Sequence, residues 1–138
     1  DNRQEQEGGS LSANYSIGQF SVGYGETRHA PAQKTNVGGS AAVVTDYYEN
    51  QGFSIGFAVN DNLSVSFTEE NSEINRKSKA TATDAITRTD VEMEIQTIDI
   101  AYTMGGATFS VSTSDASNDS YTTGDDSSEH IFAMSLAF

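Results

Sequence analysis

The sequence of 138 residues contains no cysteine, no tryptophan and one proline, Pro31. Without cysteine, the chain can form neither a disulfide scaffold nor a zinc–thiolate site. Long apolar runs are also absent, because the longest strictly apolar stretches, such as residues 41–44, contain four residues. A membrane-spanning helix needs about 20 apolar residues, so the sequence excludes a helical span.

Basic residues are few. Lys and Arg total 7 against 20 Asp and Glu, which gives a formal net charge of −13. This balance argues against nucleic acid and anionic membrane surfaces as partners. The mean hydropathy of −0.47 is that of a soluble protein, but membrane β-barrels give similar values because their lipid-facing and lumen-facing residues alternate. The sequence begins with Asp1 rather than Met, so we expect a processed or partial chain.

Apolar residues recur at every second position in seven segments, which is the period of a β-strand with one apolar face. The segments cover about residues 9–17, 20–24, 53–59, 63–67, 91–104, 107–113 and 130–138. Short turns are predicted at 18–19, 60–62 and 105–106, and long polar loops at about 28–46, 71–90 and 116–128. The pattern predicts an all-β, antiparallel chain. Short turns at one end and long loops at the other are typical of an outer-membrane barrel.

The last strand shows the alternation most clearly. One face of residues 130–138 carries Phe132, Met134, Leu136 and Phe138, and the other face carries mainly small residues. Alternation up to a terminal aromatic residue is typical of the closing strand of an outer-membrane barrel. The alternative for this segment is the edge strand of a soluble β-sandwich.

The parity of the apolar positions changes once. Val91, Met93 and Ile95 occupy odd positions, whereas Ile98 and the apolar residues after it occupy even ones. A shift of one residue moves every side chain to the other face, so we expect a β-bulge near residues 96–97. The alternative is that the first half of this strand lies beyond the membrane, where the facing of side chains matters less.

The face opposite to the apolar one carries small hydroxylated residues, which fit a wide, water-filled lumen or, alternatively, the solvated face of a sandwich. The predicted lumen-lining residues are Ser64, Ser66, Thr68, Ser110, Ser112, Ser135 and Asp99. Asp99 lies between Ile98 and Ile100, and should face inward because an ionised group toward lipid would cost several kcal/mol. Further lumen candidates are Glu70, Glu92 and Glu94.

Aromatic residues gather near the predicted short turns and the C-terminus. Barrel aromatics form girdles at the edges of an apolar band about 25 Å tall. The predicted girdle, exposed on the outer wall, consists of Tyr15, Phe20, Phe57, Tyr102, Phe109 and Phe138. Four more rings should lie on the same wall, within the band or at its far edge: Tyr24, Phe53, Phe67 and Phe132.

The chain resembles the C-terminal part of Gram-negative general porins of the alphaproteobacterial type. The strand pattern carries this resemblance over nearly the whole chain, and the terminal strand and the hairpin Tyr102-Thr-Met-Gly-Gly-Ala107 are its most specific parts. It implies a transmembrane barrel of about sixteen strands, usually a homotrimer, in the outer membrane. It also implies passive diffusion of small hydrophilic solutes and ions, with no enzymatic activity and no cofactor.

Seven strands are too few for such a barrel, and complete bacterial barrels have an even number. We therefore expect residues 1–138 to be the C-terminal portion of one barrel domain, and residues 1–8 to be the remnant of an exterior loop. The expected partners are outer-membrane lipid and the missing N-terminal part of the same barrel. The acidic composition implies a preference for cations, because negative potential concentrates cations at a pore mouth.

Two other classes of protein fit part of the pattern. A soluble or fibre-forming antiparallel β adhesin would pack the same apolar face against a second sheet. The barrel of a plugged transporter or of a secretion system would hold another domain in its lumen.

The polar stretches offer two further binding hypotheses. Hard oxygen ligands for Ca²⁺ are present in the group Asp115, Asp119, Asp125, Asp126 and Glu129, without the spacing of an EF-hand. One predicted exterior loop contains four basic residues among two acidic ones: Arg76, Lys77, Lys79 and Arg88 with Asp84 and Asp90. The basic residues suggest an anchor for lipopolysaccharide phosphates, and the alternative is an ordinary solvated loop. No pattern places a catalytic group near His29 or His130, so we expect no enzyme.

Overall fold

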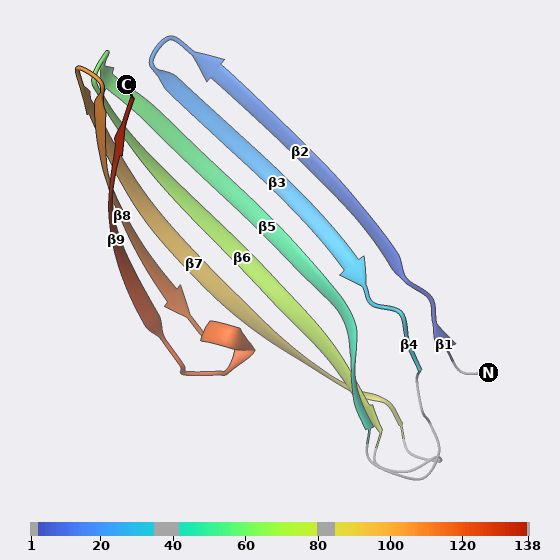
Figure 1. Cartoon of the computed structure of the whole chain (residues 1–138). Coiled ribbons are helices and arrows are strands. Elements are labelled where there is room, and N and C mark those ends of the chain that lie inside the picture. Colours follow the sequence, from blue (N-terminus) through green and yellow to red (C-terminus); the bar gives the residue numbers. More distant parts are fainter. Residues whose placement is uncertain (1–2, 35–41, 80–84, 138) are drawn as a thin grey trace.

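The structure is a computed structural model that describes residues 3–34, 42–79 and 85–137. Its elements are β1 (Arg3–Gln4), β2 (Glu7–Ile17), β3 (Phe20–Ala30), β4 (Gln33–Lys34), β5 (Ala42–Asn60), β6 (Leu63–Lys79), β7 (Thr87–Met104), β8 (Ala107–Ser117), the 3-10 turn η1 (Asp119–Tyr121) and β9 (Ser127–Leu136). Seven strands, β2, β3 and β5 to β9, form one antiparallel sheet in sequence order, and β1 pairs with β4 (Figure 1). The prediction of an all-β antiparallel chain is confirmed. None of the described segments forms a helix long or apolar enough to cross a membrane.

The three predicted short turns are confirmed, and they lie at the same end of the sheet (Figure 1). Gly18 and Gly105 have φ angles of 57° and 63°, which glycine adopts without steric cost. In the second turn, the Asn60 side-chain oxygen accepts hydrogen bonds from the backbone N–H groups of Asn62 and Leu63, at 2.9 and 3.0 Å. Turn chemistry therefore predicts the connections at this end correctly.

Two of the three predicted long loops, 28–46 and 71–90, are largely strand in their described residues, whereas the third, 116–128, contains η1 and little strand. β5, β6 and β7 contain 19, 17 and 18 residues and extend deep into the polar stretches 28–46 and 71–90. Residues 3–4 and 7–8, expected in a loop remnant, belong to β1 and β2. Periodicity misses these extensions because polar residues on both faces produce no apolar alternation, whereas the backbone hydrogen bonds of the ladder do not depend on it.

The register of β7 is continuous, so the predicted bulge near residues 96–97 is wrong. Gln96 and Thr97 pair with Glu69 and Thr68, which are consecutive residues of β6, and the pairing with β8 is equally regular. The parity changes because the apolar residues before and after this point lie on opposite faces of the sheet. The register shifts lie in β5 instead, between Thr45 and Tyr47 and between Ala58 and Asn60.

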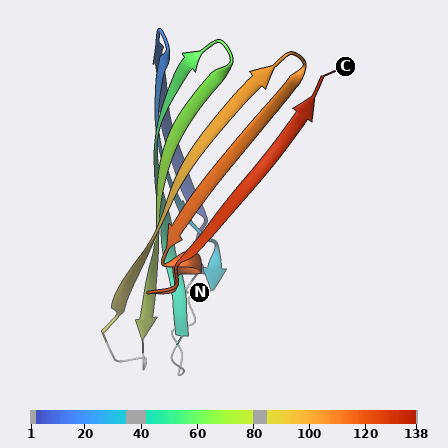
Figure 2. The ribbon, with the colours of Figure 1, turned by 90° about the vertical axis from the view of Figure 1, so that its left-hand side faces the viewer.

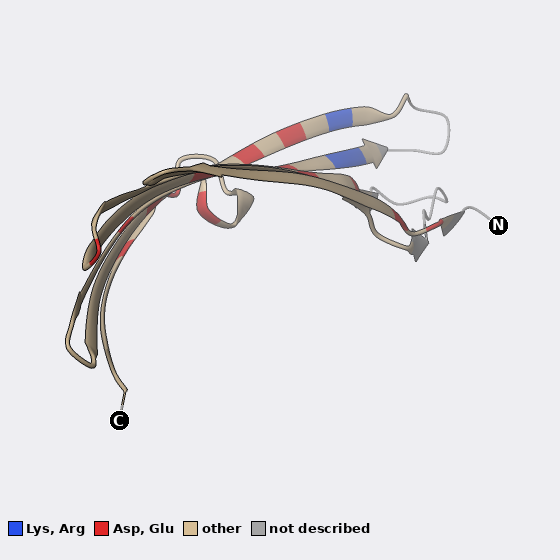
Figure 3. Cartoon of the chain, turned by 90° about the horizontal axis from the view of Figure 1, so that it is seen from above, with Lys and Arg blue, Asp and Glu red and all other residues tan. Residues whose placement is uncertain are grey.

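The sheet is strongly curved and has a convex and a concave side (Figures 2 and 3). The segment with η1 lies on the concave side (Figure 3), where Tyr121 contacts Ser72 of β6. Ser72 shares its face with Ser66, because side chains two residues apart on a strand point the same way. The concave face is crowded: a Cβ atom added to Gly23 would lie 2.6 Å from Ser54 Oγ. Its small residues therefore suit the curvature.

The described residues have almost no interior. Ile74 and Asn75, each 3% exposed, are the buried residues among them, whereas 20 large hydrophobic side chains are exposed. Monomeric soluble proteins rarely expose contiguous apolar surface on this scale. The described part of the sheet therefore leaves most of its large apolar side chains uncovered.

Candidate functional site

Three apolar rows cross the convex face next to the short turns. Residues of one row are direct register partners on neighbouring strands, so their side chains lie side by side. The middle row is Ile17, Phe20, Phe57, Val65, Ile100, Val111 and Phe132. The other rows are Tyr15, Val22, Ile55, Phe67 and Ile98, continued by Thr113 and His130, and, nearer the turns, Leu63, Tyr102, Phe109 and Met134. The ring centroids of Phe20 and Phe57 are 4.7 Å apart.

The predicted aromatic residues lie on this convex face, except Phe138, which is outside the described residues. The exposed rings are Tyr15, Phe20, Tyr24, Phe53, Tyr102, Phe109 and Phe132. Phe57 and Phe67 are half-buried between neighbours of their rows. No described ring is buried, so none contributes to a closed core.

The convex face becomes acidic beyond the apolar rows. An acidic row is formed by direct register partners on β5, β6 and β7, namely Glu49, Glu73 and Glu92. Arg28 of β3 is the register partner of Glu49 and lies at the end of this row. The Arg28 guanidinium lies 4.0 Å from the centre of the Tyr47 ring. Burial raises the pKa of Glu73, and repulsion from Asp90, Glu49 and Glu92 adds to the rise.

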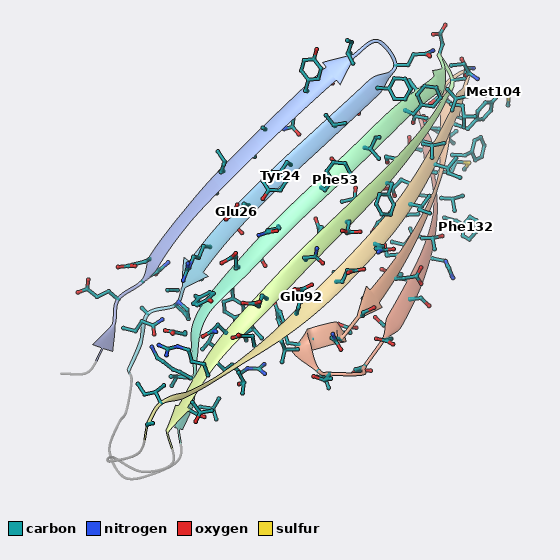
Figure 4. The ribbon with its side chains drawn as sticks, turned by 180° about the vertical axis from the view of Figure 1, so that it is seen from behind. Tyr24, Glu26, Phe53, Glu92, Met104 and Phe132 are labelled. Carbon is teal, nitrogen blue, oxygen red and sulfur yellow. The ribbon has the colours of Figure 1, made fainter. Side chains whose placement is uncertain are left out.

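The boundary between the apolar rows and the acidic row of the convex face is visible along the strands. Figure 4 labels Tyr24, Phe53, Met104 and Phe132 in the half near the short turns, and Glu26 and Glu92 farther from these turns. One face of the same strands is therefore apolar over one half and acidic over the other.

Replacing Glu73 with glutamine is expected to stabilise the protein. Like charges directly opposite in a sheet are destabilising, by about 0.2–1 kcal/mol before screening. Because the pKa of folded Glu73 is raised, its ionisation weakens the folded state at neutral pH, and this cost disappears below the folded and unfolded pKa values. The free energy of unfolding in urea, measured on the full chain, should rise at neutral pH and stay unchanged in acid.

Glu7→Gln is the matched control, because the register partner of Glu7 on β3 is Ala30. It should change the unfolding free energy less than Glu73→Gln does. Equal gains in both variants would assign the effect to net charge rather than to the acidic row, and a loss in Glu73→Gln would contradict repulsion within the row.

The concave face carries the seven residues of the main set predicted to line a lumen. Ser66, Asp99 and Ser112 are direct partners on β6, β7 and β8, which places Asp99 between two serines. The other predicted residues share this face by register: Ser64, Thr68, Ser110 and Ser135. The result is a wall of small hydrophilic side chains with an acid in the half near the short turns.

The predicted facing is wrong for two of the further lumen candidates. Glu70 lies on the concave face, but Glu92 and Glu94 lie on the convex one, because the continuous register of β7 turns them the same way as Ile98. The apolar residues of this half consequently face the concave side. They are Val91, Met93 and Ile95, with Ile74 and Tyr48 on the neighbouring strands.

The basic residues predicted in one loop lie on strands and on both faces. Lys77 and Arg88 are partners on the convex face, whereas Arg76 lies on the concave face. Lys77 Nζ is 2.6 Å from Asp46 Oδ1, and Arg88 Nε is 3.7 Å from Asp46 Oδ2. Two of the four proposed phosphate ligands therefore have a counter-ion within the protein. Lys79 also belongs to β6, and Asp84 lies outside the described residues.

The acidic group proposed for Ca²⁺ does not converge. Within the described ranges, no three His, Asp or Glu side chains come close enough to hold a metal ion. Asp115 lies on the convex face of β8 and Glu129 on the concave face of β9, because the register partner of Glu129 is Ser114, whose side chain points the opposite way to that of Asp115. Asp119 accepts a hydrogen bond from Ser127 Oγ at 2.7 Å, which lowers the pKa of its carboxyl. The remaining two members, Asp125 and Asp126, lie between η1 and β9.

The structure also contains a polar row that the sequence pattern did not indicate. It lies on the concave face, at the level where β8 ends. Thr27, Asn50 and Ser72 are direct partners on β3, β5 and β6. Tyr121 of η1 reaches this row, with its hydroxyl 2.6 Å from Ser72 Oγ. The signal available in the sequence was Tyr121 itself, an aromatic residue isolated in a polar stretch.

No protein-family model matches the chain, and no curated protein or solved structure matches it. The argument for function therefore depends on the chemistry and geometry of the two faces.

Proposed function

We propose that the chain is part of a porin-like β-barrel in the outer membrane of a Gram-negative bacterium. Small hydrophilic solutes and ions diffuse passively through this barrel, with a preference for cations. The convex face contacts lipid and the concave face lines the lumen. The observation that carries the proposal is the exposed set of apolar rows on the convex side of a sheet whose concave side is polar.

The extent of the apolar rows supports lipid contact. Along β7, the stretch from Ile98 to Met104 covers about 20 Å at ~3.3 Å per residue, comparable with the apolar band of about 25 Å in membrane barrels. A soluble sandwich would need a second sheet over these rows. The other sheet in the described residues is the two-stranded pair β1–β4, at the end away from the short turns (Figure 1).

The acidic half of the convex face supports the proposal that the barrel wall continues beyond the membrane. An ionised carboxylate within the apolar band would cost several kcal/mol, so the acidic row must lie in water. Beyond the membrane the convex face no longer needs to be apolar. The apolar residues Val91, Met93 and Ile95 can therefore lie on the concave face without a bulge.

The two open edges of the sheet support the proposal that it belongs to a larger barrel. In the described sheet, β2 and β9 each have a neighbour on one side only. An open edge in lipid would leave backbone N–H and C=O groups without hydrogen-bond partners, which is costly there. We therefore propose that further strands of the same barrel pair with β2 and β9.

Replacing Asp99 with asparagine tests the proposed channel. Asp99 lies on the concave face, and a negative charge at this position of the lumen wall raises the local concentration of cations. In planar bilayers, the complete barrel, with the further strands that pair with β2 and β9, should form channels, and Asp99→Asn should lower the cation-over-anion permeability ratio modestly. The difference should shrink as salt is raised, because the screening length falls from about 10 Å at 0.1 M to about 3 Å at 1 M.

Asp115→Asn is the control, because it removes the same charge from the convex face of the neighbouring strand. It should alter selectivity less than Asp99→Asn. An absence of channels would contradict the proposed function, and an equal effect of both substitutions would contradict the assignment of Asp99 to the lumen wall.

A further inference from the structure

The segment between β8 and β9 folds back over the concave face. The pairing of β7 with β8 ends at Glu94 and Ser117. The chain then turns through three non-glycine residues in left-handed conformation, Asn118, Ser120 and Tyr121, with φ of 53°, 54° and 57°. The turn η1 packs against β7 on the inner side of the curved sheet (Figure 3).

Hydrogen bonds within the segment fix this conformation. Asn118 Nδ2 donates to the backbone oxygen of Glu92 at 2.8 Å, and Asn118 Oδ1 accepts from the backbone N–H of Gly124 at 2.9 Å. The backbone N–H of Asp119 donates to the backbone oxygen of Asp125 at 2.6 Å. Left-handed conformations of such residues persist where surrounding contacts over-determine them. The segment is therefore a defined structural element.

Tyr121 joins this element to the wall. Its ring lies 6.0 Å from that of Tyr48 on β5, centroid to centroid, and its hydroxyl lies 2.6 Å from Ser72 Oγ on β6. Ser72 uses its single proton to donate to Asn50 Oδ1, so Tyr121 must be the donor to Ser72. Asn50 Nδ2 in turn donates to Thr27 Oγ1 at 2.9 Å. A chain of hydrogen bonds thus runs from the segment across three strands.

We propose that residues 118–126 form a constriction of the channel, and that Tyr121 holds it against the wall at the level of Thr27, Asn50 and Ser72. This inference rests on the proposed function, because only a lumen on the concave side can be narrowed by a segment on that side. This placement fits the apolar residues on the concave face of β7, Val91, Met93 and Ile95, because η1 packs against β7 on that face. Ile74, one of the two buried residues in the described part of the chain, lies in this region between Tyr48 and Val91.

Single-channel conductance of the complete barrel in planar bilayers tests the constriction. Tyr121→Ala removes both the ring contact and the hydroxyl, so the segment should leave the wall and the conductance should rise. Tyr121→Phe keeps the ring contact and loses the donor to Ser72, so its conductance should be intermediate. Tyr47→Ala is the matched control, because the Tyr47 ring lies against Arg28 on the convex face, and it should leave the conductance unchanged.

A nitroxide probe distinguishes release of the segment from its effect on conductance. The chain contains no cysteine, so Thr123→Cys provides a single labelling site in the exposed part of the segment. The label should be more mobile in Tyr121→Ala than with Tyr121 in place. A mobile label with unchanged conductance would overturn the constriction, and an unchanged label would overturn the holding role of Tyr121. A complete absence of channels with Tyr121 in place would instead contradict the proposed function.

Discussion

Arginine in place of Ile100 is expected to destabilise the full chain in lipid vesicles by about 2–4 kcal/mol. Ile100 is 43% exposed and lies in the middle apolar row of the convex face, between Val65 and Val111. If lipid covers this row, the guanidinium group must enter the apolar band or deform it. The measurement is the free energy of unfolding in urea in the presence of vesicles.

Ala101→Arg is the matched control, because Ala101 is the next residue on β7 and lies on the concave face with Ser64 and Ser110 as partners. In a water-filled lumen the guanidinium group stays hydrated, so the loss of stability should be much smaller, and the cation preference should fall. Similar losses at positions 100 and 101 would indicate that neither face contacts lipid. A larger loss at 101 would indicate that the concave face is the apolar one.

The half of the fold near the short turns could be predicted from the sequence because local chemistry determines it. Alternation in segments such as Phe53–Val59 fixes both the strand and its apolar face, and Gly18 and Gly105 occupy positions that require left-handed backbone. The facing of Asp99 follows from the same alternation. These signals come from residues close together in the chain, so a single sequence suffices to find them.

The other half of the fold could not be predicted, because its strands carry polar residues on both faces. β5 to β7 are held there by backbone pairing and by cross-strand contacts such as that between Lys77 and Asp46, and these leave no periodic signal. The contact of Tyr121 with Ser72 joins residues 49 positions apart. It depends on where β8 ends, which the sequence pattern does not reveal.

A cysteine scan along β7 is expected to give the second large effect, an alternating pattern of accessibility. Single cysteines at positions 98 to 101 can carry a fluorophore without interference, because the chain contains no native cysteine. Positions 98 and 100 lie on the convex face, and 99 and 101 on the concave face. Cysteines at 92 and 94 extend the scan into the acidic half on the convex side.

The most direct test is the quenching of these labels by brominated lipid and by aqueous iodide, with the full chain in vesicles. We predict quenching by lipid at 98 and 100, by iodide at 99 and 101, and by iodide alone at 92 and 94. This pattern would place the apolar rows in lipid, the concave wall in water and the acidic row beyond the membrane. Quenching by iodide at all six positions, with no contribution from lipid, would contradict a membrane-spanning sheet.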